Sequence, residues 1–296
     1  MQGLLLINKP SGRTSFSVVS QVKKTAGQKR VGHTGTLDPL ATGVLPILLG
    51  RATVLSSIML DEDKKYTAKI KLGVTTDTDD ITGKVINEKK VSVSQDTLKS
   101  ALEHFVGKIE QIPPMYSAIK KDGVRLYKLA REGKSVDLTA RNIEIFEIKQ
   151  IEDLDGDNEF VIETHVSKGT YIRSLARDIG EYLGCGATLS SLERTYASGF
   201  DISDCVDLEN LNNENISEFL LDEEIAVKHL RSLEITEKQA VRFSNGGQLG
   251  FERLKEKNFS DNELFRVKYN KRLLGIGIAD CEKEHIGIKC ITNYPD

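Results

Sequence analysis

Hydrophobic and polar residues alternate along several short stretches of the chain, which is the two-residue period of a strand buried on one face. In the clearest example, residues 66–72, the apolar residues from Tyr66 to Leu72 face one way and Lys69 and Lys71 face the other. Apolar runs bounded by turn residues indicate further strands. The expected strands are 4–7, 44–49, 66–72, 160–166, 189–197, 233–235, 264–269, 273–278 and 285–291.

The period of an amphipathic helix is clearest after Lys168-Gly169, where apolar residues from Ile172 to Leu183 form one stripe and Arg173 lies on a different face. Gly184 and Gly186 are expected to end this helix. Shorter helices are expected at 15–22, with Ser15 or Ser17 as the cap, and at 50–59, 97–106 and 237–243. Residues 1–228 therefore predict one large domain, and residues 229–296 predict a small β-rich domain.

Composition describes an ordinary globular chain. The 296 residues are 39% hydrophobic and 29% charged, which excludes a disordered protein. No apolar run is long enough to cross a bilayer, and the first residues do not have the pattern of a signal peptide. The four cysteines are scattered, which argues against a zinc site or a disulfide framework and favours a cytosolic location.

Charge is segregated along the chain. Residues 201–224 contain nine acidic residues and no Lys or Arg, so the remainder carries +6 although the whole chain carries −3. A basic remainder permits a nucleic-acid partner. The acidic stretch itself is expected to be a solvated linker or a surface helix.

Asp38 is the only acidic residue among the first 60, which also contain seven basic residues. It lies in a segment, residues 32–43, with three glycines and a proline, so a shaped loop is expected. Pro39 favours an extended conformation at Asp38. A lone carboxylate in a positive field has two interpretations: a reactive group that faces an anionic substrate, or a carboxylate that caps a turn or pairs with a lysine.

Residues 113–141 form a second unusual segment. Seven basic residues, including Lys120 and Arg125, are interleaved with Tyr116 and Tyr127 and only three acidic residues. This pattern suits an exposed arm that grips phosphates and stacks on bases. The alternative is a solvated hairpin followed by a helix.

Several motifs, in this order, resemble the TruB family of pseudouridine synthases. They are Asn8-Lys9-Pro10 with Gly12, the Gly32–Gly43 segment around Asp38, Lys65-Tyr66, Gly73 with Thr76–Asp79, Pro113–Ala118, Gly123 with Arg125 and Tyr127, and Lys168–Arg173. The resemblance extends over nearly all of residues 1–200. It implies an α/β catalytic domain around a mixed, largely antiparallel sheet over residues 1–228, and a β-rich domain of the PUA type over 229–296.

The resemblance also implies an activity. The expected reaction isomerises uridine 55 in the T-loop of tRNA to pseudouridine, with no cofactor and no metal. The expected partner is tRNA alone, with no membrane and no required protein partner, and the chain is expected to be a monomer in the cytoplasm. Two alternatives stay open: a pseudouridine synthase that depends on a guide RNA, and a tRNA-folding chaperone whose main task is binding.

The same resemblance assigns roles to individual residues. Asp38 is expected to be the catalytic nucleophile or base, which attacks the sugar, attacks the ring or removes a ribose proton. Arg173 is expected to pair with Asp38. Tyr66 is expected to stack on the target base and is a candidate for removing the proton from carbon 5. The residues expected to bind substrate are His33, which fills the vacated stack, Tyr171 and Leu192 in the uracil pocket, Lys9 in packing or phosphate contact, and Lys120 and Arg125 on the RNA-gripping arm.

Overall fold

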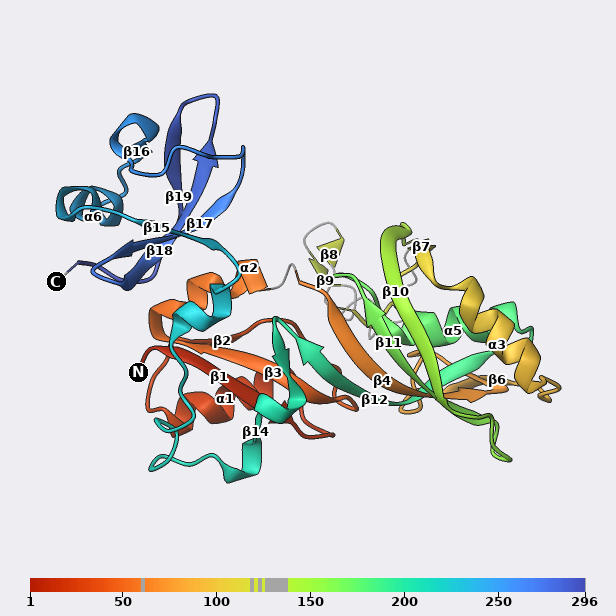
Figure 1. The fold of residues 1–296 in the computed structure, drawn as a ribbon. Coiled ribbons are helices and arrows are strands. Elements are labelled where there is room, and N and C mark those ends of the chain that lie inside the picture. The colour runs from red at the N-terminus through yellow and green to blue at the C-terminus, as the bar shows by residue number, and fades with distance from the viewer. Residues whose placement is uncertain (60–61, 118–119, 122–123, 126–137, 296) are drawn as a thin grey trace.

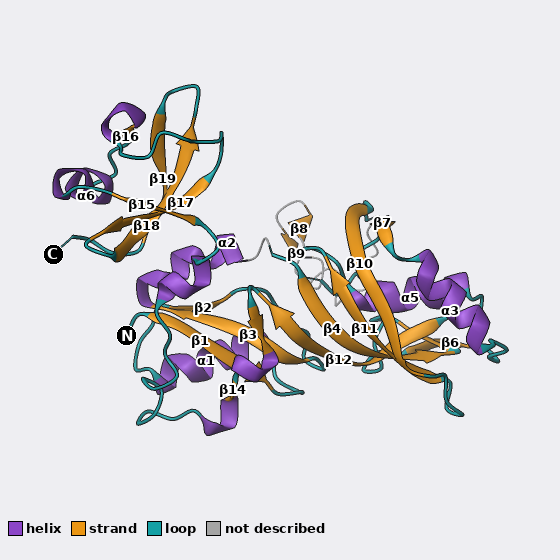
Figure 2. Ribbon diagram, in the orientation of Figure 1, coloured by secondary structure: helices purple, strands orange, loops and turns teal. Residues whose placement is uncertain are grey.

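The computed structural model describes residues 1–59, 62–117, 120–121, 124–125 and 138–295. They form a large mixed sheet with helices against it, and a smaller sheet near the C-terminus (Figures 1 and 2). None of the helices in these residues is long and apolar enough to cross a membrane.

The large sheet contains ten strands in the spatial order β14-β1-β3-β12-β4-β11-β10-β7, with β13 beside β12 and β2 beside β3. Only β1 with β14 and β3 with β12 pair in parallel, so the sheet is mixed and largely antiparallel, as the resemblance implies. In chain order the strands are β1 (Gly3–Lys9), β2 (Val31–His33), β3 (Thr42–Leu49), β4 (Lys64–Leu72), β7 (Gly107–Gln111), β10 (Arg141–Glu152), β11 (Glu159–Val166), β12 (Ala187–Ala197), β13 (Phe200–Asp201) and β14 (Val206–Asp207).

Both faces of the sheet are covered near β1, because alternate residues of β1 enter different cores. Leu5 and Ile7 belong to a core cluster that includes residues of α1 (Ser15–Thr25) and, further along the sheet, of α3 (Gln95–His104) and α5 (Ile172–Tyr182). Leu4 and Leu6 pack with η1 (Gly50–Leu55), α2 (Ser56–Met59) and part of the C-terminal sheet. The strands and helices predicted for this region are confirmed, but strands β2, β7, β10, β13 and β14 of the large sheet were not predicted. Two short hairpins were also missed: β5 (Val74–Thr76) with β6 (Val85–Glu88), and β8 (Lys120–Lys121) with β9 (Val124–Arg125).

The predicted cap of the first helix is wrong. Thr14 is the N-cap of α1, and its side chain accepts a hydrogen bond from the backbone N–H of Ser17 at 3.0 Å. Ser15 lies inside the helix and is buried, where its hydroxyl bonds the backbone of Leu37 instead. The sequence has three hydroxyl residues within four positions, Thr14, Ser15 and Ser17, and each could cap the helix. The packing of the Asp38 loop against Ser15 decides which of them is the cap.

The prediction for the acidic stretch, residues 201–224, is also wrong. It contains short strands and the single-turn helices η2 (Ile202–Asp204), η3 (Leu208–Asn210) and η4 (Glu223–Val227), with no surface α-helix. Its apolar residues Leu208, Leu211 and Ile216 are buried in the main core, so the segment is packed against the sheet rather than solvated as a linker.

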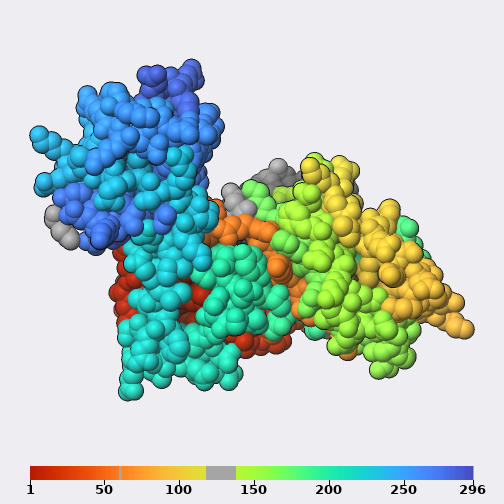
Figure 3. Space-filling model, viewed as in Figure 1, coloured from red at the N-terminus to blue at the C-terminus, as the bar shows by residue number. Residues whose placement is uncertain are grey.

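Five strands form the C-terminal sheet, in the order β15-β17-β18-β19-β16. They are β15 (Arg231–Glu234), β16 (Leu249–Gly250), β17 (Leu264–Tyr269), β18 (Arg272–Asp280) and β19 (His285–Ile291), with α6 (Glu237–Ser244) between the first two. The proposed boundary at 228–229 falls in the short connection between η4 and β15. Figure 3 shows the C-terminal strands gathered into a lobe above the N-terminal strands.

Charged and polar contacts join the C-terminal strands to the rest of the chain. Glu224 accepts hydrogen bonds from Arg266 and Lys268, each at 2.7 Å. Gln2 donates to Glu223 at 2.6 Å and to Asn293 at 2.9 Å. Acidic residues at the end of the 201–224 stretch therefore bind the small sheet to the large one.

Candidate active site

The loop that carries Asp38 connects β2 to β3, and hydrogen bonds to both neighbours of Asp38 fix its backbone. Leu37 is buried, and the Ser15 hydroxyl accepts from its N–H at 2.9 Å and donates to its carbonyl at 3.1 Å. On the other side of Asp38, the Pro39 carbonyl accepts the N–H of Gly12 at 2.8 Å. Because both neighbours of Asp38 are fixed, its carboxyl group has a defined position.

Asp38 and Arg173 form the predicted pair. The Arg173 Nη2 donates to Asp38 Oδ1 at 3.1 Å, and Arg173 Nε lies 2.8 Å from Asp38 Oδ2. The Arg173 side chain is 5% exposed and that of Asp38 is 32% exposed, so the carboxyl group remains open to a ligand while the guanidinium is enclosed. A two-point contact of this kind fixes the orientation of the carboxylate.

Arg173 lies in the first turn of α5 and has further partners. It donates to the carbonyls of Thr78 at 3.1 Å and of Tyr116 at 2.9 Å, and its Nη1 lies 3.9 Å from Asp80 Oδ2. One guanidinium therefore connects the Asp38 loop, the turn after β5 and the beginning of the 113–141 segment.

Opposing effects act on the Asp38 carboxyl group. Burial raises its pKa above the ordinary value, and the negative charge of Asp80 adds to this effect. The positive charges of Arg173 and Lys9 act against it, but the pKa remains raised. Asp38 is therefore a stronger base than an exposed aspartate.

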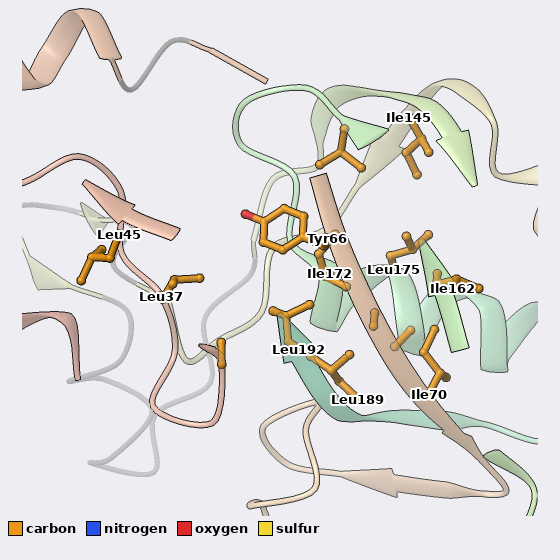
Figure 4. Close-up of a cluster of buried hydrophobic side chains, with 14 of the residues drawn as sticks. Leu37, Leu45, Tyr66, Ile70, Ile145, Ile162, Ile172, Leu175, Leu189 and Leu192 are labelled. Atoms are coloured by element: carbon orange, nitrogen blue, oxygen red, sulfur yellow. The ribbon is translucent and has the colours of Figure 1, made fainter. Parts of the chain in front are cut away.

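Tyr66 and Leu192 lie beside this loop on adjacent strands, β4 and β12. Both are 7% exposed. Figure 4 shows the Tyr66 hydroxyl pointing toward the segment that carries Leu37, with Leu192 next to the ring. An aromatic ring and a leucine at the edge of the core form an apolar wall that a flat base can contact.

Tyr171 immediately precedes α5, at its N-cap position. Its backbone is held by the buried Gln111, whose amide donates to the Tyr171 carbonyl at 3.1 Å and accepts from its N–H at 2.8 Å. Burial raises the pKa of the Tyr171 hydroxyl, so this group is a hydrogen-bond donor at neutral pH.

His33 is half-buried at the end of β2, where the Asp38 loop begins. Burial lowers its pKa, and the nearby Arg194 guanidinium lowers it further. Among the described residues, its buried Nδ1 has no hydrogen-bond partner. A neutral, flat imidazole is suited to stacking on bases.

Lys9 has no exposed surface, and its ammonium donates to three backbone carbonyls: Pro10 at 2.8 Å, Arg13 at 2.6 Å and Pro39 at 3.4 Å. Of the two roles expected for Lys9, packing is therefore compatible with the structure and phosphate contact is not. Burial lowers the pKa of Lys9 to about 8.

This lowered pKa predicts a pH-dependent contribution to stability. Between about pH 8 and 10.5 the folded chain releases the Lys9 proton while the unfolded chain retains it. The free energy of unfolding should therefore rise with pH in this window, by about 3 kcal/mol at most, relative to a Lys9→Met variant. Denaturant unfolding of both proteins at several pH values measures the difference. A difference that stays constant across this window would contradict the prediction.

Two polar residues near the site were missed by the sequence reasoning. Asp80 is 5% exposed and adds negative charge beside Arg173, although the quoted motif ended at Asp79. Arg194 is 1% exposed and lies two residues after Leu192 in β12. The signal for Asp80 was its place directly after the motif; Arg194 carried no signal, because its partners are backbone carbonyls.

Lys120 and Arg125 pair through their backbones as β8 and β9. Much of the 113–141 arm, including Tyr127, lies outside the described residues. Across the described part of the chain, no group of three or more His, Cys, Asp or Glu side chains is placed to hold a metal ion.

Comparisons with known proteins identify the family of this chain. The family model of the TruB pseudouridylate synthase N-terminal domain matches residues 23–172, and that of the tRNA pseudouridylate synthase B C-terminal domain matches residues 173–235. A tRNA pseudouridine synthase B of Clostridium tetani is 44% identical over 278 residues, covering 94% of this chain and 95% of the relative. That of Clostridium acetobutylicum is 44% identical over 292 residues, covering 98% and 99%.

Solved structures have the same fold. An H/ACA RNP bound to a substrate RNA containing 2′-deoxyuridine matches with a TM-score of 0.75 at 24% identity, covering 99% of this chain and 87% of the other. A Cbf5-Nop10-Gar1 complex matches with a TM-score of 0.74 at 26% identity, covering 99% and 84%. The matched family models and the two Clostridium relatives place the chain in the TruB family of pseudouridylate synthases.

Proposed function

We propose that this protein converts uridine 55 in the T-loop of tRNA to pseudouridine, acting as a monomer without a guide RNA, a protein partner or a cofactor. The observation that carries the proposal is the Asp38 carboxylate, which is partly exposed and held by the enclosed Arg173 guanidinium. Family membership, and relatives named tRNA pseudouridine synthase B, support the reaction type and the class of substrate.

The chemistry needs a carboxylate and a protected pocket. The bond between the ribose anomeric carbon and uracil N1 breaks, and positive charge develops on the sugar. A carboxylate stabilises that charge or attacks the carbon, as in retaining glycosidases. The uracil then turns, and a bond forms between the anomeric carbon and uracil carbon 5. The hydrogen of carbon 5 leaves as a proton and uracil N1 takes up a proton, so the product is an isomer of the substrate. Exclusion of water keeps the detached uracil from being lost.

The remaining residues are assigned to the bound base. The target uridine is stacked within a folded loop, so it must be flipped out to reach Asp38. Tyr66 stacks on the flipped uracil, and Tyr171 and Leu192 line its pocket. His33 enters the space that the base has left, where a neutral imidazole avoids the cost of burying a charge.

The direct test is incubation of an unmodified tRNA transcript with the purified protein alone. Release of tritium from carbon 5 of labelled uridine reports the reaction, because the new carbon–carbon bond displaces that hydrogen. Turnover on the bare transcript is the expected result. No release without a guide RNA or an added protein would favour the guide-dependent alternative and contradict the proposal.

The arm is assigned to contact with the RNA backbone. Replacing all three of Lys120, Lys121 and Arg125 by glutamine should weaken tRNA binding. It should also reduce the slope of log Kd against log salt by about 2–3, because the variant makes fewer phosphate contacts and fewer counterions are released on binding. Filter binding at several salt concentrations measures both. A matched triple replacement of the exposed residues Lys90, Lys99 and Lys108 is the control. An unchanged slope in the arm variant would remove the arm from the RNA interface.

A further inference from the structure

Arg194 is among the largest fully buried side chains of the described residues, with 1% of its surface exposed. Within the described part of the chain, no acidic side chain forms an ion pair with it. Enclosing a guanidinium without an anionic partner is costly, unless several hydrogen bonds satisfy it. The hydrogen bonds of the Arg194 guanidinium therefore indicate its role.

Both of its hydrogen-bond acceptors are backbone carbonyls at the two ends of the Asp38 loop. Arg194 Nε donates to the carbonyl of Val44 at 2.8 Å, and Nη2 donates to that of Gly35 at 3.3 Å. Asp38 lies between these residues in the chain. One rigid, planar group therefore fixes the separation of the two ends of the loop.

The backbone of Arg194 also contacts the end of this loop. Arg194 pairs with Gly43 in the parallel register between β12 and β3. A Cβ atom built on Gly43 would lie 2.2 Å from the Arg194 carbonyl oxygen, and Gly43 has a φ of +101°. Only glycine permits this close approach, so the loop and β12 are closely fitted at this point.

The partners of Arg194 keep negative charge away from Asp38. A carboxylate beneath the loop would satisfy Arg194, but it would also compete for Arg173 and make ionisation of Asp38 harder. Neutral carbonyls avoid this. Lys9, on the other side of the loop, is held in the same way by three carbonyls. The loop therefore rests on two buried cations, and Asp38 remains available to Arg173.

We infer that Arg194 is a positioning residue, which sets the geometry of the loop between His33 and Val44 and acts on the chemical step rather than on tRNA affinity. This inference rests on the proposed function. Burial lowers the pKa of His33, and the positive charge of Arg194 lowers it further. A residue that only filled the core would neither fix the geometry of the loop nor lower the pKa of His33.

The test uses the full chain with Arg194→Met and Arg194→Lys. In Arg194→Met the rate at saturating tRNA should fall about 100-fold, since small misplacements of a reacting group have effects of this size. The Kd for tRNA should change less than about 5-fold, and the pKa of His33, measured by NMR without RNA, should rise. Arg194→Lys retains the charge but can reach fewer carbonyls, so it should show an intermediate rate and a His33 pKa that stays low.

Arg242→Met is the matched control, because the exposed Arg242 likewise donates from Nε to a carbonyl, that of Gln248, at 2.7 Å. It should leave the rate and the His33 titration unchanged. The inference is overturned if folded Arg194→Met turns over at the wild-type rate, or if its His33 pKa does not move. If Arg194→Met fails to fold, Arg194→Lys decides: a loss of about tenfold or more supports the inference and a wild-type rate overturns it. The histidine titration needs no RNA, so it separates failure of this inference from failure of the proposed function.

Discussion

Asp38→Asn should lower the rate of pseudouridine formation by at least about 10⁴-fold, a loss typical of removing an essential nucleophile or base. Asparagine has nearly the shape of aspartate and can still accept a hydrogen bond from Arg173, so the loop should keep its structure. It lacks the charge that stabilises the sugar or the electron pair that attacks it. Affinity for tRNA should stay within a few-fold of the wild type, because the proposed contacts with the RNA backbone lie elsewhere.

Single-turnover kinetics and equilibrium binding on the same tRNA transcript separate the two effects. Asp178→Asn is the matched control, since Asp178 also pairs with an arginine of α5, Arg177 Nη2 at 2.8 Å. It should keep the wild-type rate within about threefold, as expected for a partly exposed ion pair. Turnover in Asp38→Asn would refute the catalytic assignment. Loss of tRNA binding in proportion to the rate would make Asp38 a structural residue.

Arg173→Met should have the second-largest effect, a loss of about 10²–10³-fold in rate at neutral pH. The variant loses the contact that orients Asp38 and the positive charge that lowers its pKa. The Asp38 pKa should therefore rise further above the ordinary value. If the ionised form is the active one, the acidic limb of the pH–rate profile moves to higher pH, and the deficit is smaller in alkaline solution than in acid.

Rate profiles of wild type, Arg173→Met and Arg173→Lys measure this shift. Lysine keeps a positive charge without the two-point geometry, so its acidic limb should lie nearer to that of the wild type. Arg177→Met, one turn further along α5, is the control and should retain the wild-type profile. An acidic limb that does not move in Arg173→Met would show that Arg173 does not tune Asp38. Thermal unfolding identifies any variant that fails for lack of stability, because Arg173 also binds the Thr78 and Tyr116 carbonyls.

Periodicity and turn residues predicted nine of the nineteen strands that the structure describes, and the helices α1, α3, α5 and α6, because elements such as β4 and α5 each bury one regular face. It could not predict which polar residues would join that face. Arg173 follows Ile172 directly, and its burial depends on Asp38, which lies 135 positions earlier in the chain. No spacing rule connects such distant positions, so their pairing was predicted only through the resemblance to the family.

Charge was a poor guide where apolar residues are sparse. Nine acidic residues concealed the three buried residues Leu208, Leu211 and Ile216, which are too few to mark a packed segment by themselves. β13, β14 and β16 were missed because each contains only two residues. β10 was missed although it has twelve residues, because few of its side chains are buried and they do not alternate regularly. The buried cation Arg194 was unpredictable for another reason: it binds backbone carbonyls, which every residue possesses and no sequence motif marks.

Mapping pseudouridine by position in a bare tRNA transcript is the most direct test of the central claim, that a carboxylate held by an arginine detaches and reattaches uracil at one nucleotide. After incubation with wild-type protein and no other component, the modification should be present at position 55 and nowhere else. With Asp38→Asn it should be absent. Pseudouridine at other positions, none with the wild type, or equal amounts with both proteins would contradict the account.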